Sequence, residues 1–207
     1  MNTENSALSK RLLFLFFCSG ISAIIYQIVW QRVLFASFGT NIESITIIVS
    51  VFMLGLGLGS LIGGKMSNTS GRNLIGYFVF FEVSIGLFGL ASIPLIAYVS
   101  NLTLELVSGW LPLIVFVILV VPTFAMGATL PVLVTYLFKQ TRSVGGTVTN
   151  LYYINTLGSA IGCLLTVGVL FILGTLQATV YIAACLNFII ALIAFLNIRK
   201  KEPVYET

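Results

Sequence analysis

Six long apolar runs follow one another along the sequence, and they restrict its fold more than any other feature. Each run is long enough to cross a hydrocarbon layer of about 30 Å as a helix that rises about 1.5 Å per residue. Lipid offers no hydrogen bonds to an irregular backbone, so helices are the expected form. The predicted spans are Leu12–Phe38, Ile42–Gly64, Leu74–Ser100, Trp110–Phe138, Val148–Leu173 and Ala178–Ile198.

The composition agrees with this interpretation, since 58% of the residues are hydrophobic and only 8% are charged. We therefore predict an all-α polytopic membrane protein with six transmembrane helices. Residues 1–207 are expected to form a single six-helix transmembrane domain, with short tails at 1–11 and 199–207. Pro112, Pro122 and Pro131 predict a kinked or interrupted fourth helix. With so little sequence outside the spans, no soluble catalytic domain is expected.

The basic residues predict how the helices are oriented. Of the ten Lys and Arg residues, all but Arg32 fall in segments that six spans would place on one side of the membrane. Lys and Arg favour the cytoplasmic side, so the N and C termini are both predicted to be cytoplasmic. The net charge of +4 is explained by this orientation and by contact with the anionic headgroups of the lipid bilayer. A nucleic-acid partner is not expected.

Glycines recur at four-residue intervals in two spans. Gly55, Gly59 and Gly63 share one face of the second helix, and Gly158 and Gly162 repeat the pattern in the fifth. Faces of small residues let two helix backbones approach closely, which supplies much of helix association in lipid. We expect both helices to pack through these glycines, with each other or with neighbours. The same faces could also be sliding surfaces of a transporter.

Four segments together resemble one protein family. They are SGISAIIYQIVWQRVL (19–34), LGLGLGSLIGG (54–64), PTFAMGATLPVL (122–133) and LYYINTLGSAIGCLL (151–165). In this order they are similar to the membrane part of bacterial proteins in which a transmembrane module is fused to a spermidine-synthase-like domain. The resemblance implies a bundle like half of a major-facilitator transporter, a bacterial inner (cytoplasmic) membrane location and a link to polyamines. The synthase-like half has no counterpart among these 207 residues.

Glu82 is the acidic residue that lies well inside a predicted span, about two turns into the third helix. A charge at that depth costs about 2.5 to 3.5 kcal/mol on insertion scales, so the side chain should face the interior of the bundle. There it could pair with a cation, bind a cationic solute or stay protonated. The other interpretation is a hydrogen-bonded packing residue, and the sequence leaves both open.

Further polar side chains inside or at the edge of the spans complete a candidate substrate-binding set. Its members are Glu82, Tyr26, Gln27, Arg32, Tyr152 and Asn155. Hydrogen bonds between helices contribute about 0.6 to 2 kcal/mol in membranes, which suits packing as well as a polar substrate path. For Arg32, at the outer end of the first span, a structural clamp with Glu43 is favoured over an anion site.

The sequence offers little for catalysis, since it has no His and no Asp, and its three cysteines lack metal-ligand spacing. No catalytic residue, metal or cofactor is predicted, and a membrane-embedded enzyme is the least supported alternative. Two functions stay open. One is a module that transports or binds a small polar or cationic solute such as a polyamine. The other is a non-catalytic anchor or scaffold for a separately encoded aminopropyltransferase-like or other partner protein. Six spans alone would not enclose a two-sided path, so a homodimer or a complex with another protein is expected.

Overall fold

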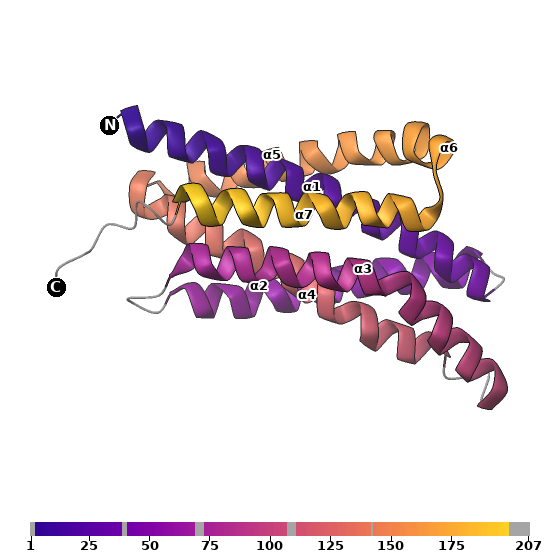
Figure 1. Cartoon of the computed structure of the whole chain (residues 1–207). Coiled ribbons are helices and arrows are strands. Elements are labelled where there is room, and N and C mark those ends of the chain that lie inside the picture. The colour runs from indigo at the N-terminus through magenta and orange to yellow at the C-terminus, as the bar shows by residue number, and fades with distance from the viewer. Residues whose placement is uncertain (1–2, 39–40, 69–72, 107–110, 142, 199–207) are drawn as a thin grey trace.

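The computed structural model describes residues 3–38, 41–68, 73–106, 111–141 and 143–198, and this part of the chain is almost entirely helical (Figure 1). Six helical stretches are long and apolar enough to cross a membrane, which confirms the predicted all-α, multi-pass architecture. The helices are α1 (Thr3–Phe38), α2 (Asn41–Ser67), α3 (Leu74–Leu106), α4 (Leu111–Thr141), α5 (Val144–Leu165), the π-helical segment η1 (Thr166–Leu170), α6 (Phe171–Leu173) and α7 (Leu176–Ile198).

The spans run up and down, so the start of α1 and the end of α7 lie at the same end of the bundle (Figure 1). Among the described basic residues, Lys10, Arg11, Lys65 and Lys139 belong to the helix ends at that side, whereas Arg32 lies toward the opposite end of α1. The sorting of basic residues that the sequence predicts is thus present in the described spans. That this side faces the cytoplasm stays a prediction.

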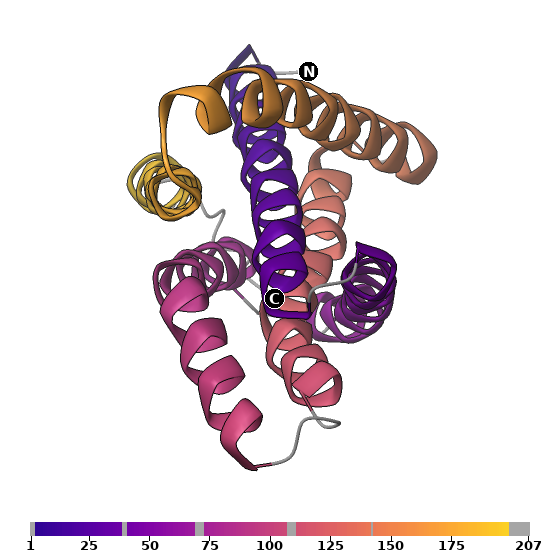
Figure 2. The ribbon, with the colours of Figure 1, turned by 90° about the vertical axis from the view of Figure 1, so that its right-hand side faces the viewer.

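α1 occupies the centre of the bundle and contacts each of the other five long helices (Figure 2). The main interfaces repeat between two sets of three helices. The first set is α1, α2 and α3, and the second set is α4, α5 and α7. α1 packs on α5 as α4 packs on α2, α1 packs on α7 as α4 packs on α3, and α1 meets α2 as α4 meets α5. If α1 is exchanged with α4, α2 with α5, and α3 with α7, each of these interfaces becomes its counterpart in the other set. Because each set holds three spans, the two sets cross the bundle in opposite directions.

The sequence predicts a kink or an interruption in the fourth helix; the interruption is wrong, since α4 continues through Pro122 and Pro131, and the kink stays a prediction. A proline frees the carbonyl four residues before it. For Pro131 this is the carbonyl of Gly127, which accepts a hydrogen bond from Ser60 Oγ on α2 at 3.1 Å. The neighbouring helix thus satisfies the freed group, and α4 need not break. The irregularity falls in the fifth span instead, where η1 follows α5 and the backbone is extended at Gly174.

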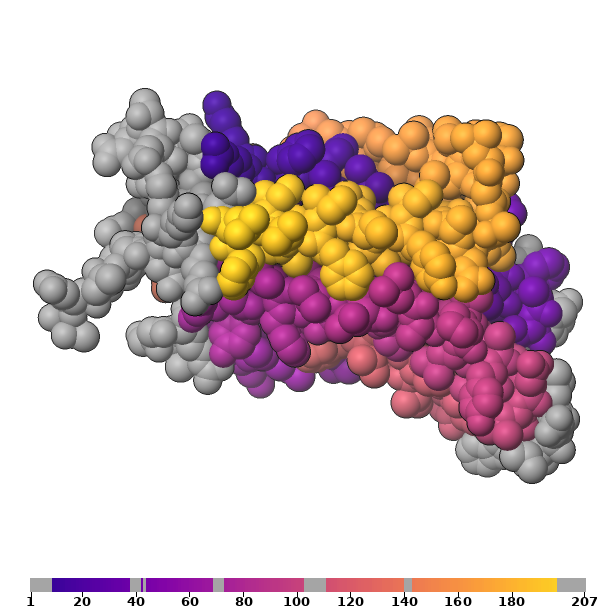
Figure 3. Space-filling view, in the orientation of Figure 1, coloured from indigo at the N-terminus to yellow at the C-terminus, as the bar shows by residue number. Residues whose placement is uncertain are grey.

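The helices differ in how much of their surface the bundle covers. Only 17% of the most apolar window of the fifth span and 33% of that of α2 are buried, against 50% for α1 and for α4. α3 and α7 lie side by side along one face (Figure 3). α2 and α5 therefore present the largest uncovered helix faces, and the interior site described next lies around α1, α3 and α7.

Candidate functional site

Glu82 is completely buried, with 0% of its surface exposed, in the region where α3 meets α1 and α7. Ser19 Oγ on α1 donates a hydrogen bond to Glu82 Oε1 at 2.7 Å. Asn187 Nδ2 on α7 donates to Glu82 Oε2 at 2.6 Å. Each carboxylate oxygen is therefore bonded from a different helix, and Glu82 joins three spans at one buried point.

The hydrogen bonds continue from Asn187 to a tyrosine. Tyr26 donates its hydroxyl hydrogen to Asn187 Oδ1 at 3.1 Å, and both side chains are fully buried. Ser19 and Tyr26 are seven residues apart on α1, so the helical repeat brings them to the same face, about two turns from each other. We call Ser19, Glu82, Asn187 and Tyr26 the buried polar network.

The partners of Glu82 in this network are electrically neutral. Within the described residues Glu82 forms no salt bridge, and no group of three His, Cys, Asp or Glu side chains could hold a metal ion. A buried charge normally needs an opposite charge or several hydrogen bonds to offset its lost hydration. In the ionised form of Glu82, two short hydrogen bonds from neutral groups leave the negative charge itself unbalanced. The arrangement is therefore suited to take up one positive charge.

Aromatic rings cover the network toward the end of α1 that carries Arg32. Tyr26 stacks on Trp30 with 5.2 Å between ring centroids, and Trp30 also meets Phe52 of α2 at 6.1 Å and Phe88 of α3 at 5.8 Å. A Cβ added at Gly89 would lie 2.6 Å from Tyr26 Cε1, so only glycine leaves room for this ring. Trp30 is fully buried, and its Nε1 has no hydrogen-bond partner among the described residues.

The predicted substrate-binding residues are not brought to one place. Glu82 and Tyr26 share the network, whereas Gln27 is half-buried and forms no hydrogen bond with its four members. On α5, Asn155 is half-buried against α1, and Tyr152 is 65% exposed. Tyr152 therefore lies apart from the buried polar network, whereas Asn155 Oδ1 would lie 2.9 Å from a Cβ added at Gly20, the residue next to Ser19.

Arg32 lies away from the network and is exposed. Its guanidinium carbon Cζ stands 4.2 Å from the centre of the Phe171 ring, a cation–π contact between α1 and α6. The side chain of Glu43 lies outside the described residues, so the expected Arg32–Glu43 clamp stays a prediction. The contact with Phe171 was not foreseen, because nothing in the spacing of the two residues indicates it.

Sequence reasoning missed two members of the network, Ser19 and Asn187. Asn187 is an amide inside an otherwise apolar span, so the argument that selected Glu82 applied to it as well. Ser19 carried no such signal, because a serine in a membrane helix commonly bonds its own backbone. Its neighbour Ser22 does so, donating to the Ser19 carbonyl at 2.9 Å.

The two glycine faces lie against neighbouring helices rather than against each other. Gly55, Gly59 and Gly63 face α4, and Gly158 and Gly162 face α1. A Cβ added at Gly59 would lie 2.9 Å from the carbonyl carbon of Phe124 and 3.0 Å from the nitrogen of Ala128. Backbone atoms cannot turn aside as a side chain can. The α2–α4 interface therefore leaves no room for a larger residue at Gly59.

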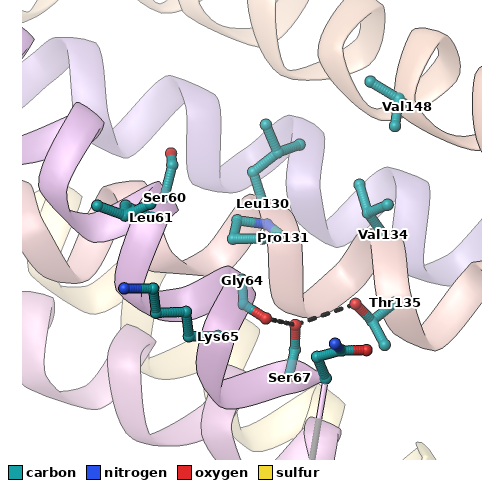
Figure 4. A pocket seen from close by; sticks show the side chains of 11 residues that line it. Ser60, Leu61, Gly64, Lys65, Ser67, Leu130, Pro131, Val134, Thr135 and Val148 are labelled. Carbon is teal, nitrogen blue, oxygen red and sulfur yellow. Dashed lines mark hydrogen bonds between the residues drawn. The ribbon is translucent and has the colours of Figure 1, made fainter.

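A hollow of about 760 Å³ lies between the ends of α2 and α4 and is bordered by α5 at Val148 (Figure 4). Ser67 Oγ donates to the carbonyl of Gly64 at 3.0 Å and lies 3.0 Å from Thr135 Oγ1, as the dashed lines show (Figure 4). Lys65 is the charged residue of the lining. Glu82 does not line this hollow, so the hollow and the buried polar network are separate features.

No protein-family model, curated protein or solved structure matches this chain. The resemblance to the transmembrane module of spermidine-synthase-like proteins therefore stays a prediction from the four sequence segments. The geometry itself presents a multi-pass bundle with repeated helix interfaces and a buried carboxyl group with neutral partners where α1, α3 and α7 meet.

Proposed function

We propose that this chain is a membrane-embedded module that binds and transports a small polar or cationic solute, with Glu82 as its functional carboxylate. The observation that carries this proposal is the complete burial of Glu82 with only neutral partners. Ionisable residues inside the membrane are costly and commonly mark paths for substrates, ions or protons. A purely structural link between three helices could be made by glutamine, without the cost of a buried charge.

The repeated interfaces support a transporter. Many secondary transporters contain repeats of opposite orientation, and their sites lie where the repeats meet. In this chain α1 and α3 belong to one set of three spans and α7 belongs to the other. The buried polar network crosses from one set to the other through the bonds of Asn187. Motion of one set against the other would therefore strain or rearrange these hydrogen bonds.

The sequence resemblance supplies the first solute to test. A module of the spermidine-synthase-linked type in a bacterial inner membrane would meet polyamines. Polyamines are thus the preferred solutes, and Glu82 is the functional carboxylate on which their transport would depend. An anchor or scaffold would need no such carboxylate, which is why transport is the favoured function.

A second copy of the chain is the proposed partner. α2 and α5 are the least covered spans, and the hollow beside them contains Lys65, Asn68 and Thr135. Six spans alone would not enclose a two-sided path, so a second copy is expected against these uncovered faces. Cysteine pairs across this face, in a chain with its own cysteines replaced, should cross-link two copies in membranes, and a strictly monomeric protein would contradict the homodimer.

Transport can be tested with the purified chain in proteoliposomes that contain labelled spermidine. Wild type should show saturable flux that depends on pH, and Glu82→Gln should lose it while remaining folded, because the substitution removes the charge and keeps the shape. Glu206→Gln makes the same chemical change near the C-terminus and should behave as wild type. Equal flux in wild type and Glu82→Gln would refute the role of Glu82. No flux for cationic, zwitterionic and neutral solutes, together with co-purification of a partner enzyme, would instead support the scaffold.

A further inference from the structure

We infer that the ligand of Glu82 is a single proton, and that the hydrogen bond from Tyr26 to Asn187 restricts the site to it. This deepens the proposed function by naming what the functional carboxylate binds. The role of the bound proton in transport rests on the proposed function. Proton binding by Glu82 does not depend on it. The solute would then be held elsewhere on the transport path.

Tyr26 and ionised Glu82 together favour one orientation of the Asn187 amide. Its hydroxyl donates to Oδ1, so Nδ2, which can only donate, faces Glu82 Oε2 at 2.6 Å. With the amide reversed, Nδ2 could donate to the Tyr26 hydroxyl, but the Tyr26 hydrogen would lose its acceptor, and Oδ1 would face the ionised carboxylate with no hydrogen between them. Oε2 therefore serves as the acceptor whether Glu82 is ionised or carries a proton on its other oxygen.

Oε1 remains as the place for the proton. Its partner Ser19 Oγ, at 2.7 Å, is a hydroxyl and can donate or accept. When Glu82 is ionised, Ser19 donates to Oε1. When Oε1 carries the proton, the new O–H donates to Ser19 Oγ, and the Ser19 hydrogen turns to a carbonyl of its own helix, as serines in helices commonly do. Both oxygens of Glu82 thus stay hydrogen-bonded in either state.

Larger cations lack both space and ligands at this point. Glu82 is fully buried, and it lines neither the hollow at Lys65 nor the smaller one at Asn73. An ammonium group presents three donors, and Ca²⁺ or Mg²⁺ takes about six oxygen ligands or more. Besides the carboxylate, the network offers Ser19 Oγ, because Asn187 Oδ1 is already occupied by Tyr26. Too few oxygens remain for anything larger than a proton.

The other titratable groups around Glu82 do not supply the missing positive charge. They are Cys18 and Tyr26 from α1, and Cys185 from α7, which acts through Tyr26. Neither a thiol nor a phenol carries a positive charge in any of its protonation states. Within the described residues, proton uptake by Glu82 itself is therefore the way in which the buried charge can be neutralised.

The test is infrared difference spectroscopy of the full chain in lipid nanodiscs, without solute, across about pH 4 to 10, the range reached by buried glutamates. Wild type should show a carboxylic-acid carbonyl band that grows as the pH falls and is lost in Glu82→Gln. The band should be the same in sodium chloride, in choline chloride and with spermidine added. Absence of a Glu82-dependent band, or its suppression by sodium or spermidine, would overturn the inference.

Tyr26→Phe tests what restricts the site. Without the hydroxyl, Asn187 can turn Oδ1 toward the carboxylate and offer a further oxygen to a cation, so sodium or spermidine should now suppress the band. Tyr181→Phe is the control, since its hydroxyl accepts a hydrogen bond from Gln177 Nε2 at 2.7 Å on the exposed side of α7. A Tyr26→Phe band as insensitive to cations as that of wild type would refute the role of Tyr26.

A second variant keeps the test valid if Tyr26→Phe fails to fold. Asn187→Leu removes the amide oxygen altogether, so its band must remain insensitive to both cations, and sensitivity would contradict the inference. The titration also separates this inference from the proposed function. A chain that binds the proton but moves no solute would contradict transport alone, whereas flux without a Glu82 band would contradict proton binding alone.

Discussion

Two interfaces of the bundle join helices by opposite means. Between α2 and α4, glycines such as Gly59 let one backbone rest on the other, and the contact depends on shape. Between α1, α3 and α7, the buried polar network links side chains through hydrogen bonds of 2.6 to 3.1 Å. Lipid tails are as apolar as leucine, so neither interface gains from the hydrophobic effect, and each represents one of the two remaining ways to associate.

The two interfaces are expected to tolerate different substitutions. At Gly59 any added atom meets backbone, whereas at Glu82 a neutral side chain of the same size would fit. The glycine interface is therefore expected to be sensitive to volume and insensitive to pH. The polar network should be tolerant of isosteric changes and sensitive to the state of its carboxylate.

The largest effect is expected from Gly59→Leu. The new side chain would have to displace the backbone of Phe124 and Ala128, and overpacking of this kind costs about 3 kcal/mol or more when the neighbours cannot relax. The expected result is a strongly lowered unfolding midpoint in detergent, with loss of folded protein in membranes. Thermal unfolding of the purified variants measures this.

Gly57→Leu is the matched control for Gly59→Leu. It lies on the same helix two residues away, and an added Cβ at Gly57 meets nothing within 4 Å. The change in unfolding free energy should stay within about 0.5 kcal/mol, as for other exposed positions. If Gly57→Leu and Gly59→Leu destabilise the protein equally, the cost arises from the loss of glycine itself and not from the α2–α4 contact.

The six spans and their irregular details differ in how far the sequence predicts them. Length and hydropathy are local, so the spans were found, and α2, α3 and α7 begin within about two residues of the predicted starts. Of the kink or interruption expected in α4, the interruption was wrong, because Ser60 on another helix supplies the missing hydrogen bond at Gly127. That compensation depends on a contact between α2 and α4, which no local pattern of prolines reveals.

The site was predictable only in part, for the same reason. Glu82 stood out because a charge inside an apolar run is unusual on its own. Its partners Ser19 and Asn187 are ordinary residues in sequence, and 105 residues separate Glu82 from Asn187. Grouping Tyr152 with Glu82 rested on membrane depth alone. Depth is shared by residues on every helix, but the face of each helix decides which of them meet.

A smaller effect is expected from Asn187→Leu, which breaks the polar network without overpacking it. Glu82 Oε2 would lose its donor inside the bundle, and an unsatisfied buried acceptor costs about 1 to 3 kcal/mol. Unfolding measured in the same detergent should show this decrease. Ser84→Ala is the control, since Ser84 Oγ donates to the carbonyl of Phe80 in its own helix, and its loss should be nearly neutral. Equal effects of both variants would mean that the network adds little stability.

The smallest effect concerns a third kind of contact, the cation–π pair of Arg32 and Phe171, which joins α1 to α6 at 4.2 Å. Exposed pairs of this kind contribute about 0.5 to 1 kcal/mol, less than either buried interface. A double-mutant cycle of Arg32→Gln and Phe171→Leu should give a coupling energy of that size. Arg32→Lys should keep part of it, because the ammonium group retains the charge but not the planar surface. A second cycle of Arg32→Gln with Glu43→Gln measures the clamp that the sequence predicts. If that cycle holds the coupling and the Phe171 cycle shows none, Arg32 is fixed by charge pairing and the contact with the ring is incidental.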